Sequence, residues 1–445
     1  MRFYGRQNEL AALHRALTIV RTQSSQLISV LGRRRVGKTT LIAKAFENAA
    51  IPVFSFFVQD WREEVMAKAW RDEVASVYRP EFLPDVNTIA DVISFTMNLT
   101  KDKPCVFIID ECQDLSRRAE GFWRALQTVW DQKKHSSHML LVMSGSIISA
   151  MEEIFGDYSQ PMYGRTDCRI EVRPFTPSVI QSILRDENPL ASAVDMLTVY
   201  AVTGGVAAYL ERLAARQALS AEGILDYLYS IDGEWLRSEG NVYLANEFQR
   251  KTAVYKDILY AIAQGATKWN QIQDRVNENI NSYLRRLCTF GLIEQYYPIL
   301  ETESARRARY RIVDPYMRFW LEFIAPVRMS DLAAYQNWTL LKEMTRRGLP
   351  QFLGRTLELW YRASFLESGQ WTGVGAWWDD KGQNEIDLVA VNELEGKLFF
   401  GEAKLNPAKY NALELERRKE LFLQKHRKYA NFSVQTAGLF PQAPA

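Results

Sequence analysis

Residues 27–40 read LISVLGRRRVGKTT, which joins a short apolar strand to a glycine-rich loop and the start of a helix. Residues 32–39 fit the pattern G-x-x-x-x-G-K-[ST], in which the glycines let backbone N–H groups approach phosphate oxygens. The first turn of the following helix adds the positive end of its dipole. This stretch therefore predicts a site for the phosphate groups of a nucleotide, with ATP and Mg²⁺ as the expected ligands.

The loop side chains have separate expected roles. Lys38 should bridge the β- and γ-phosphate oxygens, and the Thr39 hydroxyl should bind Mg²⁺. The three arginines strengthen the local positive potential, although they could equally serve solubility or a subunit contact. We predict that the nucleotide is contacted by Gly32, Arg33, Arg34, Arg35, Val36, Gly37, Lys38, Thr39 and Thr40.

Two further apolar strands end in polar residues. Residues 105–109, CVFII, are followed by Asp110 and Glu111, and residues 139–143, MLLVM, are followed by a Ser-Gly-Ser sequence that ends at Ser146. Asp110 stands where an aspartate must lie to hold magnesium, and Glu111 could polarise the attacking water. The alternative is an acidic pair that caps the next loop. Ser146 is a candidate sensor of the γ-phosphate, although Ser-Gly-Ser is also an ordinary turn.

Strands and helices alternate over residues 7–146, an order typical of a parallel sheet with helices on both faces. We therefore expect an α/β fold of the P-loop type. The predicted helices span about 7–22, 39–48, 62–78, 87–101 and 120–133, and the predicted strands about 27–31, 52–57, 105–109 and 139–143.

Five segments resemble the archaeal-type P-loop ATPases, which belong to the signal-transducing and AAA+-related group that includes the origin-recognition ATPases. The segments are YGRQNEL at 4–10, GRRRVGKTTL at 32–41, FIIDECQDL at 107–115, MSGS at 143–146 and YGR at 163–165. The resemblance covers about residues 1–235. It implies that Gly5 and Arg6 border the adenine pocket. It also implies that Arg165 acts on the γ-phosphate, either in its own chain or from a neighbouring subunit of a homo-oligomer.

After an ATPase core at 1–173, we predict three further domains. Short amphipathic helices at 174–250 resemble a helical lid. Residues 251–313 show three helices and a basic hairpin, which is winged-helix organisation and predicts contact with double-stranded DNA. The alternative is a protein–protein module. The candidate recognition helix and wing carry Asn281, Ser282, Arg285, Arg286, Arg306, Arg307, Arg309 and Arg311.

The C-terminal region, 314–445, combines carboxylates with a lysine. Strand alternation places Glu402 and Lys404 on one face of a predicted strand, and Asp387 on the neighbouring strand can share that face. Two carboxylates and a lysine suit a site for Mg²⁺ or Mn²⁺ that hydrolyses phosphodiesters. Glu358, on a predicted amphipathic helix, could complete this site.

The order of these residues resembles the PD-(D/E)XK restriction-endonuclease-like fold. The resemblance implies that Asp387, Glu402 and Lys404 are catalytic. It also implies that Glu358, on the predicted helix at 355–365, joins Asp387 and Glu402 as a metal ligand. The alternative is a metal-free relic that binds DNA or a protein partner.

Composition and charge exclude several classes of protein. Lys and Arg number 55 against 53 Asp and Glu, so the net charge of +2 excludes a chain that is basic overall. The first residues lack the apolar region of a signal peptide, and no apolar run approaches the ~20 residues that cross a bilayer. We expect a cytoplasmic protein without a membrane span.

Two functions remain open from the sequence. The first is an ATP-hydrolysing protein that acts on DNA, with a possible metal-dependent nuclease domain. The second is a nucleotide switch of the signal-transducing (STAND) type, whose winged-helix and C-terminal domains bind a protein partner without cleaving nucleic acid. Salt-dependent binding to duplex DNA would separate the two.

Overall fold

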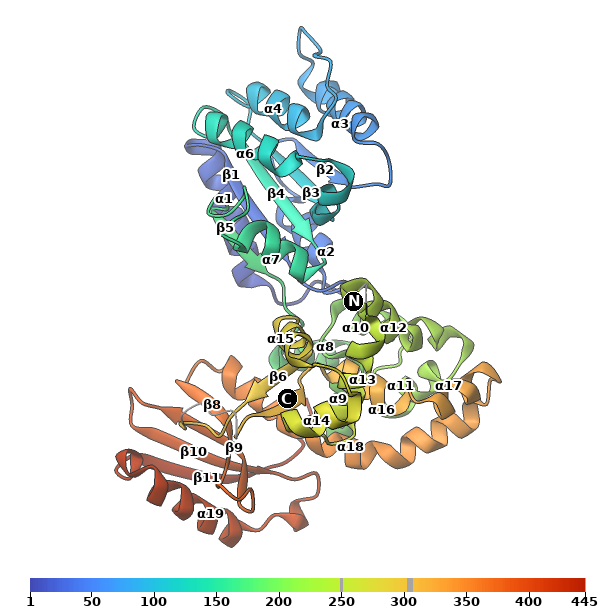
Figure 1. The fold of residues 1–445 in the computed structure, drawn as a ribbon, viewed down its shortest axis with the longest axis vertical. Coiled ribbons are helices and arrows are strands. Elements are labelled where there is room, and N and C mark those ends of the chain that lie inside the picture. The colour runs from blue at the N-terminus through green and yellow to red at the C-terminus, as the bar shows by residue number, and fades with distance from the viewer. Residues whose placement is uncertain (249–250, 302–306, 445) are drawn as a thin grey trace. The chain divides into compact units, whose positions relative to one another are not determined.

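The computed structural model describes residues 1–248, 251–301 and 307–444. The chain forms two compact units, one comprising Gly5–Arg173 and the other comprising Met1–Tyr4 together with Pro174–Ala445. Figure 1 shows the elements of both units. Among the described residues, no helix is long and apolar enough to cross a membrane.

The first unit is built on a parallel sheet. Within residues 5–173, all of them described, five strands lie in the order β2-β3-β4-β1-β5, and all paired neighbours run parallel. The predicted α/β class is therefore confirmed. The short strand β5 has no predicted counterpart, because it buries Ile170 alone of its four residues. The strands are β1 Gln26–Leu31, β2 Val53–Phe57, β3 Cys105–Asp110, β4 Met139–Gly145 and β5 Cys168–Glu171.

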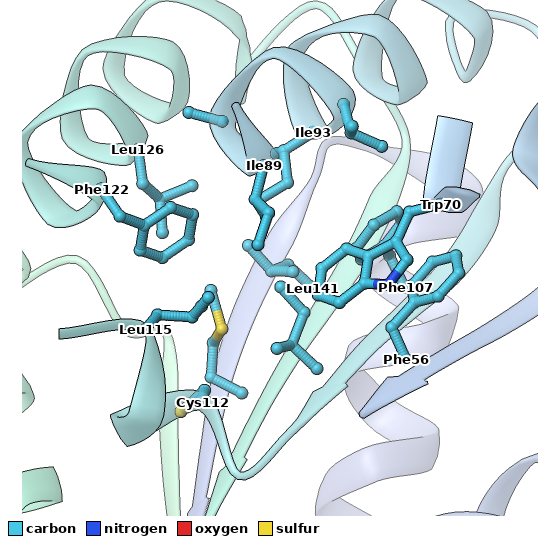
Figure 2. Packing of buried hydrophobic residues seen from close by; sticks show 14 of the residues in the cluster. Phe56, Trp70, Ile89, Ile93, Phe107, Cys112, Leu115, Phe122, Leu126 and Leu141 are labelled. Atoms are coloured by element: carbon cyan, nitrogen blue, oxygen red, sulfur yellow. The ribbon is translucent and has the colours of Figure 1, made fainter. Parts of the chain in front are cut away.

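Helices pack on this sheet through apolar stripes. In Figure 2, Ile89 and Ile93 of one helix and Phe122 of another point toward Phe107 and Leu141 of the central strands. This packing holds the strands in register and so places the loops at their carboxyl ends. The helices are α1 Gln7–Thr22, α2 Lys38–Phe46, α3 Glu63–Tyr78, α4 Ile89–Leu99, α5 Leu115–Arg118, α6 Phe122–Lys133 and α7 Ile148–Gly156.

The second unit begins with helices and continues into a strand pair. In the described part of residues 251–313, three helices precede two antiparallel strands, which is the predicted order of elements. The elements up to this point are α8 Pro177–Glu187, α9 Ala193–Thr203, α10 Ala207–Ala214, α11 Ala221–Leu228, α12 Glu234–Phe248, α13 Thr252–Ala263, α14 Trp269–Val276, α15 Asn281–Thr289, β6 Ile293–Tyr296 and β7 Arg309–Ile312.

A mixed sheet closes the second unit. Within the described residues from 307 onward, four strands lie in the order β11-β10-β9-β8, with β10 and β11 parallel and the other pairs antiparallel. The helix predicted at 355–365 is part of a much longer helix that contains Pro350. The elements are α16 Pro315–Phe323, α17 Val327–Ala334, α18 Trp338–Glu367, β8 Gly373–Trp378, β9 Glu385–Asn392, β10 Lys397–Ala403, α19 Ala412–Lys425 and β11 Ser433–Leu439.

The two faces of this sheet are covered by different helices. Leu388 and Ala390 pack with Tyr361 of α18 on one face. Val389 packs with Phe422 of α19 on the other face. The lid, winged-helix and C-terminal domains that we predict all lie within this second unit.

Candidate active site

The glycine-rich loop joins β1 to α2 with a backbone that requires glycine. A Cβ atom at Gly32 would lie 2.3 Å from the carbonyl oxygen of Val172, so no larger residue fits there. Gly37, immediately before α2, has a φ of 100°, in the left-handed region that glycine adopts without strain. The loop therefore curves tightly and leads directly into the N-terminus of a helix, which favours anions.

The side chains of the loop differ in exposure. Arg33 and Val36 are buried, whereas Arg34 and Thr40 are exposed. Lys38 is buried to 6% exposure, and its Nζ donates to the carbonyl oxygen of Gly32 at 2.8 Å. The Lys38 ammonium is therefore held over the loop, where phosphate oxygens would bind.

Thr39 and Asp110 lie side by side. The Thr39 hydroxyl donates to Asp110 Oδ2 at 2.9 Å, which links the start of α2 to the end of β3. Hydroxyl and carboxylate oxygens are the ligands that Mg²⁺ prefers, and Mg²⁺ commonly uses one or two of them together with substrate phosphates. Among the described residues, no group of three or more acidic, His or Cys side chains could hold a metal ion. The pair thus fits Mg²⁺ that shares its coordination with phosphate.

Glu111 is held by two hydrogen bonds. Its Oε2 accepts from the Ser146 hydroxyl at 2.6 Å and from Gln113 Nε2 at 2.6 Å. The structure therefore brings together Glu111 and Ser146, which the sequence places on separate strands. Gln113 is absent from our sequence-based site, although its position two residues after Glu111 is a signal that could have found it.

Arg6 contacts the loop from α1's N-terminal side. Its Nη2 donates to the carbonyl oxygen of Val36 at 3.1 Å, and its Nη1 lies 3.3 Å from Glu9 Oε1. Burial lowers the pKa of the Arg6 guanidinium. Gly5 and Arg6 both have left-handed φ angles, which turn the chain toward the loop. Their role at the adenine stays a prediction.

Arg165 lies at the other end of the sheet. Its Nη2 donates to Asp131 Oδ2 at 2.8 Å. The neighbouring Asp167 accepts a hydrogen bond from the backbone N of Leu27, near the start of β1, whereas the phosphate loop follows the end of β1. The strand separates the two sites within this chain. Action of Arg165 on the γ-phosphate, in its own chain or from a neighbouring subunit, stays a prediction.

The described arginines of the predicted wing are ion-paired. Carboxylate partners neutralise the charge that contacts with phosphate would need, so these arginines do not form the exposed basic surface that we expected. Arg306 lies outside the described residues. The pairs are Arg307 with Glu301 and Asp380, Arg309 with Glu385, and Arg311 with Glu294. On α15, in contrast, Asn281, Ser282, Arg285 and Arg286 are exposed.

Glu402 and Lys404 meet on the face of the second sheet that α19 covers. Glu402 is 7% exposed, and its Oε1 lies 2.8 Å from Lys404 Nζ and 3.6 Å from Arg418 Nη1 of α19. Both cations lie near Oε1, whereas Oε2 is buried without a hydrogen-bond partner among the described residues.

Asp387, on β9, lies beside this segment, because its Oδ2 accepts a hydrogen bond at 2.9 Å from the backbone N–H of Ala403, between Glu402 and Lys404. It lines a cavity of about 410 Å³ with Glu358 of α18 and with Arg309, Arg311 and Arg318. Burial raises the pKa of Asp387. Burial, followed by the charge of Asp387, raises the pKa of Glu358 to about 7.

Among the described residues, Glu358, Asp387 and Glu402 do not meet as one group that could hold a metal ion, and their role as metal ligands stays a prediction. The strand β9 departs from regular alternation. Gly375 pairs with Val389 and Trp377 pairs with Ile386, so β9 carries one more residue than β8 over this stretch. Such a bulge breaks the alternation of side chains on which our expectation depends.

Comparisons with known proteins match two parts of the chain. Residues 3–213 match the family described as an ATPase domain predominantly from Archaea, and residues 320–418 match a family of archaeal and bacterial proteins of unknown function. An uncharacterised protein of Methanocaldococcus jannaschii is 27% identical over 415 residues, which cover 90% of this chain and 87% of that protein.

One solved structure resembles the chain in fold, and a second match is weaker. The Walker-type ATPase of Pyrococcus abyssi has a TM-score of 0.50 at 19% identity, covering 72% of this chain and 96% of that one. The ORC2 protein of Aeropyrum pernix has a TM-score of 0.48 at 14% identity, covering 78% of this chain and 96% of that one. The match at 3–213 is to the kind of ATPase that the sequence resembles. The match at 320–418 names no function.

Proposed function

We propose that this protein binds ATP with Mg²⁺ at the loop of residues 32–39 and hydrolyses it with Glu111 as the general base. The main support for the proposal is that three segments meet at one edge of the first sheet. They are the start of α2 and the residues at the ends of β3 and β4. Thr39 bonds to Asp110 at 2.9 Å, and Ser146 bonds to Glu111 at 2.6 Å. These are the residue types that phosphoryl transfer to water requires.

Each group has a defined task in this reaction. Lys38 and the backbone N–H groups of the loop neutralise phosphate charge. Thr39 and Asp110 would hold Mg²⁺, which supplies further neutralisation when bound. Glu111 accepts a proton from water while the water oxygen bonds to the γ-phosphorus. The bond from that phosphorus to the β–γ bridging oxygen breaks, and ADP and inorganic phosphate leave.

Phosphate release from ATP by the full chain tests this function. Lys38→Ala should abolish release and weaken ATP binding, because it removes the loop's ammonium. Lys44→Ala is a matched control, since Lys44 lies on the same helix and its side chain is 43% exposed. Release by Lys38→Ala at the wild-type rate would refute the assignment.

Duplex DNA is the second part of the proposal. The observation that favours it is the exposed polar face of α15, which carries Arg285 and Arg286. We propose that α15 serves as the recognition helix of a winged helix, with its arginines on backbone phosphates. We propose no nuclease step, because Glu358, Asp387 and Glu402 do not meet as one metal-binding group among the described residues.

The competing function is a nucleotide switch that binds a protein partner. The pairing of Arg309 with Glu385 favours it, because the hairpin is then part of the protein's own packing. Fluorescence anisotropy of a labelled duplex at several salt concentrations distinguishes the two. Affinity that falls steeply with salt supports DNA contact, and absence of binding at low salt supports the switch.

A further inference from the structure

The carboxylate of the proposed base is anchored through one of its oxygens. Both hydrogen bonds, from Ser146 and from Gln113, fall on Glu111 Oε2. Glu111 Oε1 accepts no hydrogen bond from the described residues. The carboxylate plane is thereby fixed while one oxygen stays available to a water molecule.

Gln113 occupies a position that packing alone does not explain. It is 5% exposed and lies in a short 3₁₀ helix, Cys112–Asp114, which begins directly after Glu111. Because Glu111 can only accept, the amide must direct Nε2 toward it. The amide oxygen, Oε1, then lies buried without a hydrogen-bond partner among the described residues. Buried polar atoms normally have a hydrogen-bond partner. That Oε1 lacks one indicates that the amide is oriented for the hydrogen bond from Nε2 to Glu111.

The neighbouring strand leaves room for this amide. A Cβ atom at Gly145, the last residue of β4, would lie 2.5 Å from Gln113 Oε1 and 2.3 Å from Met151 Sδ. A side chain at position 145 would therefore displace the amide. Two separate segments, one after β3 and one at the end of β4, cooperate in placing Gln113 against Glu111.

We propose that Gln113 is a positioning residue for Glu111, and this inference rests on the proposed ATPase function. Its amide N–H and the Ser146 hydroxyl hold the carboxylate in one orientation. Gln113 thus keeps the base in the orientation that general-base catalysis requires.

Steady-state hydrolysis by Gln113→Met tests this role. Methionine keeps the length and apolar stem of the side chain but cannot donate. We expect kcat to fall about 10- to 100-fold with KM for ATP unchanged, since hydrogen bonds to charged groups have about this worth.

Further variants separate positioning from folding. Gly145→Ala should lower kcat with KM for ATP unchanged, because it displaces the amide. Gln113→Glu has the native shape but cannot donate when ionised, so it should lower kcat as Gln113→Met does. If Gln113→Met lowers the melting temperature, the kcat of Gln113→Glu decides whether Gln113 positions Glu111. Ser146→Thr keeps the second hydroxyl and should retain activity that Ser146→Ala loses.

Glu111→Gln serves as the reference variant. An inactive Glu111→Gln beside a Gln113→Met and a Gln113→Glu that both keep the wild-type kcat would overturn the positioning role alone. A Glu111→Gln with wild-type turnover would overturn the base assignment, and the role of Gln113 with it.

Discussion

Glu358→Gln should stabilise the second unit in a pH-dependent way. Burial, with Asp387 nearby, raises the pKa of Glu358 from 4.5 to about 7. The folded state therefore holds a proton that the unfolded chain releases, and stability is lost as pH rises from about 4.5 to about 7. Above that range the ionised carboxylate costs about 3 kcal/mol, from about 1.4 kcal/mol per pKa unit. Gln keeps the shape of the protonated acid without this cost.

Thermal melting of the full chain at pH 5 and pH 8 measures the effect. Because little of the cost is present at pH 5, the advantage of the variant should be about 2.5 kcal/mol larger at pH 8. For a unit of this size, the melting temperature should rise by about 5 °C more at pH 8 than at pH 5. Glu322→Gln is the control, since Glu322 is exposed on α16 of the same unit. Equal shifts at the two pH values would refute the reasoning.

Further outcomes follow from the other sites. Changing Arg285 and Arg286 together to Glu should weaken duplex binding and reduce its salt slope by about two units, whereas the same change at Arg346 and Arg347, an adjacent pair on α18, should leave the slope unchanged. An unaltered slope in the α15 variant would remove α15 from the DNA contact. Arg165→Ala should leave ATP binding intact and lower hydrolysis only at protein concentrations at which light scattering shows an oligomer. Equal loss in the monomer would exclude action from a neighbouring subunit.

Local motifs were predictable where the chemistry lies within one short stretch. The loop with Lys38 and the strand end with Asp110 are each decided by a few consecutive residues, and the structure brings them together as a parallel sheet requires. Gln113 carries no such pattern, because glutamine is common on surfaces. Its role depends on the left-handed backbone at Glu111 and on the space left by Gly145.

Expectations failed where they depended on tertiary contacts or on regular geometry. The side that Asp387 faces is set by a bulge in β9, which single-sequence alternation cannot reveal. From the sequence, Arg309 is expected to be a basic surface residue. In the structure, Glu385 lies beside it and pairs with it. Arg165 follows a recognisable motif. Its distance from the phosphate loop, however, depends on the fold, which places this segment near the start of β1 and not at its end.

ATP turnover by Glu111→Gln, measured beside the ATP affinity of the same variant, decides whether this sheet edge hydrolyses ATP. The substitution removes the proton acceptor while leaving Lys38, Thr39 and Asp110 in place. We expect an unchanged Kd for ATP and a kcat lower by about 10²- to 10⁴-fold, the usual contribution of a general base. Wild-type turnover by this variant would contradict the assignment of Glu111 as the base.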